Sequence, residues 1–169
     1  MTVLDILTYP DKFLKQKTAP VDNIDGAMQS VFDNMATTMY QAPGVGLAAP
    51  QVGIGRRFIV YDVAPREDGR DLHVLVNPKI VSSEGEIISE NEGCLSVPDF
   101  RADVKRAELI LVEGVDRDGN PVRFEADGLL AIVIQHELDH LDGTLFIDHI
   151  SALKHQMYKR RVLKEMKQR

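Results

Sequence analysis

Two histidines and a glutamate stand close together in the stretch QHELDHL, from 135 to 141. His136 and His140 are four residues apart, so on a helix their side chains lie on the same face, one turn apart. Two imidazoles in this arrangement can bind one metal ion, and Glu137 then stands where it can accept or donate protons. The pattern H-E-x-x-H therefore predicts the metal centre of a hydrolase, provided that a third ligand exists.

The helix that would carry these residues is expected to lie in the interior of the protein. Asp127 could cap its N-terminus, and Gly143 would end it soon after His140. The side chains before the histidines are apolar on nearly every side, namely Leu129, Leu130, Ile132, Val133 and Ile134. A buried imidazole pair costs free energy unless it is coordinated or hydrogen-bonded. This cost favours a metal site over the alternative of two polar residues on the wet edge of a helix.

Downstream residues offer few candidates for the third ligand. In one class of metalloproteases the pattern continues as H-x-x-G-x-x-H, and here Gly143 is present but the last position is Phe146. In another class a later glutamate binds the metal, but Glu165 is the only later glutamate and lies in a basic tail. His155 lies among the same basic residues, whereas His149 stays open as an alternative ligand.

The only cysteine stands upstream, in the segment NEGCLSVP from 91 to 98. A lone cysteine is most often a small core residue, but Cys94 follows a glycine and lacks apolar neighbours on both sides. One cysteine and two histidines give a tetrahedral site with the fourth position open to water, which is typical of catalytic rather than structural centres. We therefore predict that Cys94, His136 and His140 bind the metal.

The predicted ligand set has consequences for the chemistry. With one thiolate and two neutral imidazoles, a divalent cation keeps a net charge of about +1, which lowers the pKa of a neighbouring water from about 16 toward about 7. Glu137 would accept a proton as this water attacks a carbonyl, and would then deliver it to the leaving nitrogen. Asp139 or Asp142 could orient a ligand imidazole, although a solvated helix face explains both residues equally well.

The segment GVGLAAPQ, from 44 to 51, is expected to be a loop that could stabilise the oxyanion formed when a carbonyl is attacked. It is not a phosphate-binding loop, because it is apolar and lacks the Lys-Ser/Thr ending. Its glycines allow the backbone to approach a ligand, and Gln51 offers a side-chain NH₂ donor. A tight turn is the alternative interpretation of this segment.

Three segments together, GVGLAAPQ at 44–51, EGCLS at 92–96 and QHELDHL at 135–141, resemble the three signature motifs of the peptide deformylase family. Each motif is matched without a departure, and they occur in the family's order. The resemblance implies a metal-dependent hydrolase that removes the formyl group from the N-terminal formyl-methionine of newly made polypeptides and releases formate.

The resemblance also implies roles for single residues. Its three metal ligands are those already predicted, namely Cys94, His136 and His140. Glu137 is the general acid and base, while the side chain of Gln51 and the backbone N–H of Leu95 hold the oxyanion. Val45 and Gly46 would bind the peptide along its extended backbone. The pocket for the methionine side chain would be lined by residues of the metal-binding helix, namely Leu129, Ile132 and Val133.

One divalent metal ion per chain is expected. The resemblance implies ferrous iron as the native metal, with Zn²⁺, Ni²⁺ or Co²⁺ able to replace it. The ligand types alone fit zinc equally well, and zinc generally binds such a site more tightly than Fe²⁺.

The expected partners are N-formylmethionyl nascent peptides and, as in bacterial family members with a helical C-terminus, the ribosome. From Lys154 onward the chain carries seven Lys and Arg residues against one acidic residue, a charge of +6, whereas the preceding residues carry −12. A basic tail favours docking on ribosomal RNA, although a solvated helix is the simpler interpretation. The acidic body argues against a DNA-binding surface.

The order of the helices and strands expected from the sequence indicates an α+β fold. In this fold, antiparallel or mixed strands pack around a central metal-binding helix. An apolar stripe predicts an N-terminal helix over 25–40, and a C-terminal helix begins at Ser151. Strands are expected at 57–63, 72–81 and 85–89, followed by a hairpin at 108–115 and 122–126. We expect one catalytic domain over 1–150, with the basic helix at 151–169 as part of it or as its extension.

Composition limits the class of protein. A hydrophobic content of 44% and a charged content of 27% are typical of soluble globular proteins. Neither a signal peptide nor a membrane span is expected, and the single cysteine fits a reducing cytosol, so a cytoplasmic location is predicted. Two alternatives stay open: an H-E-x-x-H endopeptidase with its third ligand downstream, and a metal-stabilised binding module that acts through the tail.

Overall fold

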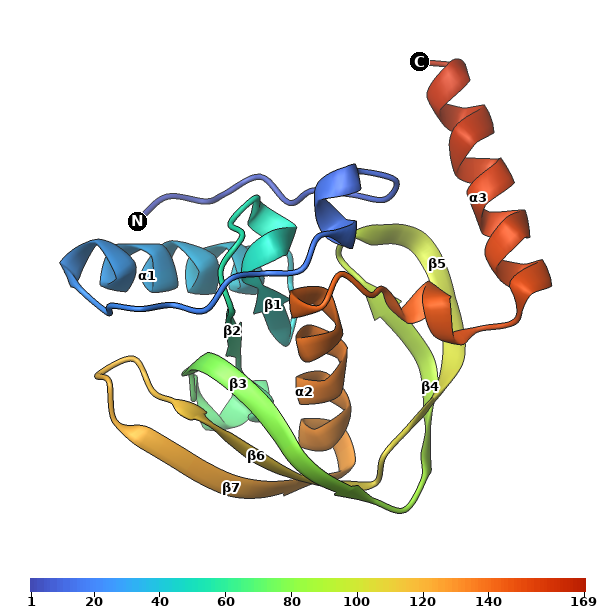
Figure 1. The fold of residues 1–169 in the computed structure, drawn as a ribbon. Helices are drawn as coiled ribbons and strands as arrows, with labels where there is room; N and C mark the ends of the chain where they lie inside the picture. The colour runs from blue at the N-terminus through green and yellow to red at the C-terminus, as the bar shows by residue number, and fades with distance from the viewer.

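Helix α2 (Gly128–Leu141) lies in the middle of the molecule, with β-strands on either side of it (Figure 1). The structure is a computed structural model that describes all 169 residues. The side chains of Ala131, Ile134 and Leu141 are fully buried, as the apolar composition of this helix predicts. Asp127 stands at the N-cap position without a capping hydrogen bond from its side chain, and Gly143 follows the helix with a φ of +76°.

Five antiparallel strands form a sheet on one side of α2, in the order β1-β2-β3-β6-β7. Their bounds are β1 Gly46–Ala48, β2 Phe58–Tyr61, β3 His73–Glu84, β6 Leu109–Val115 and β7 Pro121–Asp127. Ile59, Leu75 and Val112 from the sheet share one core cluster with Ala131 and Ile134 of α2. This packing fixes the helix that carries two of the predicted ligands.

A two-stranded hairpin, β4 (Ile87–Cys94) and β5 (Val97–Arg106), lies on the other side of α2 (Figure 1). The sequence predicted a short strand at 85–89 and no strand between Cys94 and Glu108, so β5 is an element that the prediction missed. The register shift between Ser89 and Glu92 places an extra residue in β4, and the shift between Glu92 and Cys94 places extra residues in β5. Bulges re-aim side chains, and β4 ends with Cys94 beside α2.

Helices lie near both ends of the chain. Helix α1 (Gly26–Gln41) is capped by Asp25, whose carboxylate accepts a hydrogen bond from the N–H of Met28 at 3.0 Å. Helix α3 (Ala152–Lys167) begins after Ser151 and extends away from the body toward the C-terminus (Figure 1). Tyr158 and Val162 are the buried residues of α3. Short 3₁₀ helices occupy Lys12–Lys15, Ala49–Val52, Arg66–Asp68 and Phe146–His149.

The predicted α+β class is confirmed, and so is the hairpin of β6 and β7, which is closed by a bond from the Asp116 N–H to the Asn120 carbonyl at 2.9 Å. The segment expected as a loop from 44 to 51 is more regular than predicted. Its centre is strand β1, in which Leu47 pairs with Val60, and its end is a 3₁₀ helix. No helix in the structure has both the length and the apolar character needed to cross a membrane.

Candidate active site

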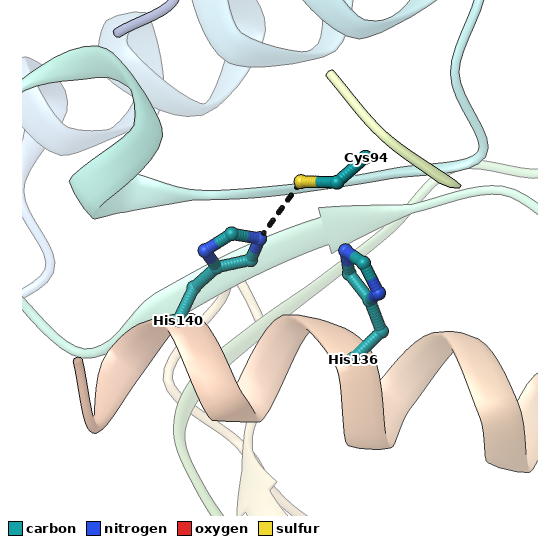
Figure 2. Close-up of side chains that lie close together, drawn as sticks. All are labelled: Cys94, His136 and His140. Atoms are coloured by element: carbon teal, nitrogen blue, oxygen red, sulfur yellow. Dashed lines mark hydrogen bonds between the residues drawn. The ribbon is translucent and has the colours of Figure 1, made fainter. Parts of the chain in front are cut away.

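Cys94, His136 and His140 lie together between the end of β4 and the C-terminal half of α2 (Figure 2). One side-chain atom from each of the three residues lies within 4.8 Å of the others, and the Cys94 Sγ is 3.3 Å from the His140 Nε2. Both imidazoles point from α2 toward the sulfur (Figure 2). The structure therefore brings together the three residues that the sequence predicted as ligands.

The local structure explains this arrangement. The four-residue spacing places the two histidine rings on one face of α2, with their centroids 5.1 Å apart. Cys94 pairs with Val97 where the hairpin turns, and the backbone N–H of Ser96 points at the Cys94 Sγ from 3.4 Å. The turn thus holds the sulfur over the helix.

Glu92, which the sequence did not single out, orients one of the imidazoles. Its carboxylate lies 2.6 Å from the Nδ1 of His136, which leaves the Nε2 of that ring free to face the sulfur. Such partners fix the tautomer and the direction of a metal-binding histidine. The sequence offered only a weak signal, because Glu92 stands two residues before Cys94 but the strand was predicted to end at 89, and residues at this spacing share a face only within a strand.

Glu92 is itself held by the buried guanidinium of Arg106, which also donates to Asp139 at 2.7 Å. Burial alone would raise the pKa of Glu92, but hydrogen bonds with His136 and Arg106 outweigh it and lower the pKa to about 2. The carboxylate is therefore ionised near neutral pH.

Asp139 and Asp142, which the sequence offered as residues that could orient a ligand, do not contact the imidazoles of His136 or His140. Asp139 binds Arg106 and the Nε2 of His149, the latter at 2.8 Å, while Asp142 forms an ion pair with Arg57 at 2.8 Å. His149, the alternative ligand, is thus engaged with Asp139 rather than placed beside the other two histidines.

Two buried polar atoms of the site have no hydrogen-bond partner, the Nδ1 of His140 and one carboxylate oxygen of Glu137. Burial and the neighbouring His136 lower the pKa of His140 well below its usual value, so this imidazole is neutral, as metal binding requires. A thiol and two imidazoles form a donor set that suits one divalent cation. The residues present therefore fit a metal ion.

Glu137 lies beside this group, with one carboxylate oxygen 3.7 Å from the Nε2 of His136. It is 3% exposed, and burial raises its pKa to about 7. A carboxyl group with such a pKa can both accept and donate a proton near neutral pH. A Cβ at Gly46 would stand 3.0 Å from the Glu137 Cγ, so the missing side chain lets β1 pack directly on this residue.

Gln51 is buried and its amide has a defined orientation. Its Oε1 accepts a hydrogen bond from the Ala48 N–H at 2.9 Å, so its NH₂ group points to the Ser96 Oγ at 3.1 Å and the Cys94 Sγ at 3.6 Å. The donor end of the amide therefore faces the cysteine. This geometry suits an NH₂ group that donates to a negatively charged oxygen.

A cavity of about 820 Å³ opens beside these residues. Its lining includes the residues predicted for catalysis and peptide binding, namely Val45, Gly46, Gln51, Leu95, Leu129, Ile132, Val133 and Glu137. Cys94 and His136 also line it, whereas Leu129 is 56% exposed at its edge. One wall, residues 98–101, was not predicted because it belongs to the missed strand β5.

Comparison with known proteins gives the same picture over nearly the whole chain. Residues 3–156 match the family profile described as polypeptide deformylase. A peptide deformylase of Desulfosudis oleivorans is 55% identical over 168 residues, which cover 99% of this chain and 97% of the relative. A crystal structure of a peptide deformylase from Legionella pneumophila matches with a TM-score of 0.90 and 44% identity, covering 99% of each chain. The chain therefore belongs to the polypeptide deformylase family of hydrolases.

Proposed function

We propose that this protein removes the formyl group from the N-terminal formyl-methionine of newly made polypeptides and releases formate. The observation that carries the proposal is the meeting of Cys94, His136 and His140 beside a cavity whose wall includes Cys94, His136 and Glu137. A peptide deformylase from Acinetobacter baumannii, 37% identical over 88% of this chain with a TM-score of 0.81, was solved with Met-Ala-Ser bound. Met-Ala-Ser is the peptide that deformylation of formyl-Met-Ala-Ser would leave.

In the proposed reaction, water adds to the formyl carbon, the carbon–nitrogen bond breaks, and formate leaves a free amino group behind. Cys94, His136 and His140 would hold a divalent cation, which would supply positive charge to acidify the water and polarise the formyl group. Glu137 accepts the proton of the water and returns it to the leaving nitrogen. The NH₂ group of Gln51 and the backbone N–H of Leu95 donate to the oxygen that becomes negative.

The same cavity would hold the peptide. Gly46 begins the edge strand β1 and Val45 directly precedes it, where extended backbone can pair with a peptide. Leu129, Ile132 and Val133 offer an apolar lining for the methionine side chain. We propose ferrous iron as the native metal, with zinc, nickel or cobalt as replacements, since the same N₂S donor set accepts all of them.

The test is formate release from formyl-Met-Ala-Ser by protein purified without oxygen, with its metal content counted. Turnover at about one metal ion per chain is the expected result, and loss of activity in air would point to iron, whose thiolate ligand is open to oxidation. Bound metal without formate release would contradict the proposal. Cleavage of unformylated peptides at internal bonds would then support the endopeptidase alternative.

Replacing Glu92 by glutamine should weaken metal binding by about 10-fold to 100-fold, because the carboxylate that orients His136 becomes a neutral amide. Competition with a chelating dye measures the metal affinity directly. Glu113→Gln is the matched control, since Glu113 forms an exposed ion pair with Arg123 that is remote from the candidate ligands. Equal metal affinity in the two variants would show that Glu92 has no role in the metal site.

We propose that residues 1–150 form a single cytoplasmic catalytic domain and that the basic helix at 151–169 belongs to it. The exposed basic side chains of α3 make docking on ribosomal RNA by counterion release a reasonable further role.

Reversing the charge of Lys159, Arg160 and Lys164 together should weaken ribosome binding by at least about tenfold at low salt. Co-sedimentation with ribosomes measures this effect, and formate release from a free peptide should stay unchanged. The control reverses three exposed lysines near the N-terminus, Lys12, Lys15 and Lys17. Equal loss in both triple variants would show only a general charge effect and would contradict docking through α3.

A further inference from the structure

Helix α3 touches the cavity wall through two hydrogen bonds to backbone carbonyls. The hydroxyl of Tyr158 donates to the Pro98 carbonyl at 3.3 Å, and the guanidinium of Arg161 donates to the Asp99 carbonyl at 2.9 Å. Pro98 and Asp99 stand near the start of β5, and both line the cavity. The helix that extends from the body is therefore anchored at the site.

Aromatic rings continue this contact toward the metal ligands. The ring of Tyr158 lies 4.7 Å from that of Phe100, which also lines the cavity, and Phe100 lies 6.0 Å from Phe146. Phe146 in turn stacks on the imidazole of His136, with centroids 6.1 Å apart. Such ring pairs pack with defined geometry, so a side chain of α3 is linked by contact to the candidate metal site.

The wall itself needs support at one position. Asp99 has a φ of +60°, a left-handed conformation that is uncommon for a residue with a side chain. Arg161 holds the carbonyl of this residue, and its guanidinium is itself held over the Tyr158 ring at 5.1 Å and near Glu165 at 3.9 Å. Tyr158 is 3% exposed, which fixes the ring against which the arginine rests.

We propose that Arg161 and Tyr158 are positioning residues for the deformylase site, because they hold the wall at 98–101 in the shape that receives the peptide. The proposal rests on the proposed function and assigns to α3 a role within the chain, separate from any docking of its exposed basic face. Neither residue touches the reacting atoms. Their loss should therefore weaken peptide binding while leaving the chemical step intact.

Arg161→Ala should raise the KM for formyl-Met-Ala-Ser by about threefold to tenfold with kcat unchanged, since a charged donor to the wall is lost. Arg160→Ala is the matched control, because Arg160 is the exposed neighbouring arginine on the same helix. Arg161→Lys, which keeps one charged donor, should recover part of the loss. An unchanged midpoint of thermal unfolding in these variants would separate the effect from general destabilisation.

Tyr158→Phe provides a second variant that keeps the buried ring and removes only the hydroxyl bond to Pro98. Its KM should rise by about twofold, since one neutral hydrogen bond is lost. Equal KM values for Arg161→Ala and Arg160→Ala would overturn the proposal. If the wild type released no formate, the proposed function would fail instead, and calorimetric binding of Met-Ala-Ser to the same variants would still test the wall.

Discussion

Replacing Glu137 by glutamine should lower kcat for formyl-Met-Ala-Ser by about 10²-fold to 10⁴-fold, while the protein keeps about one metal ion per chain. Glutamine fills the same space but cannot accept a proton from water or return one to the leaving nitrogen. The space matters, because the backbone of Gly46 packs so closely on this side chain that a Cβ at Gly46 would stand 3.0 Å from the Glu137 Cγ. Formate release at saturating peptide, together with a count of bound metal, measures both quantities.

The control for this variant is Glu125→Gln, which removes an exposed carboxylate on β7 that does not line the cavity. It should leave kcat and metal content unchanged. Undiminished formate release by Glu137→Gln would show that Glu137 transfers no proton in the reaction. Loss of metal together with activity would instead assign Glu137 to holding the metal site, and the acid–base role would be withdrawn.

The arrangement of the two histidines could be predicted from sequence because it depends on helix geometry alone. Residues four apart on a helix always lie on one face, so His136 and His140 needed only a correctly predicted helix. The apolar residues before them predicted a buried helix, and the structure places this helix in the core. The position of Cys94 beside these histidines was predicted from chemistry rather than from geometry. Only the need of a catalytic metal for a third ligand connected Cys94 with residues more than forty positions later in the chain.

The pairing of β4 with β5 could not be predicted in the same way. Pro98, Asp99, Asp103 and Lys105 belong to residue types that are depleted in strands, and local preference therefore argued against β5. The strand forms because Val97 and Val104 are buried in a core cluster with Phe146 and Tyr158, residues that arrive much later in the chain. Because β5 was not predicted, Arg106 could not be placed beside Glu92. The ion pair of Arg106 with Glu92, which holds Glu92 against His136, was therefore missed as well.

Replacing Cys94 by serine should remove most of the bound metal and lower formate release by more than about 100-fold. Serine at this position replaces a soft, negatively charged sulfur with a neutral hydroxyl, and the two imidazoles alone do not hold a catalytic metal. Loss of a direct ligand should exceed the 10-fold to 100-fold effect typical of residues that only orient ligands. Metal content after dialysis, measured beside formate release, tests both parts of the expectation.

His149→Ala is the control that decides between the two metal-site hypotheses. His149 was the downstream alternative for the third ligand, and its ring binds Asp139 at 2.8 Å in the structure. If Cys94 completes the metal site, His149→Ala keeps its metal and its activity while Cys94→Ser loses both. The opposite pattern, with metal retained by Cys94→Ser and lost by His149→Ala, would place the third ligand downstream, as the endopeptidase alternative requires. Since both variants alter one side chain beside the same helix, the comparison separates ligand loss from general disturbance of α2.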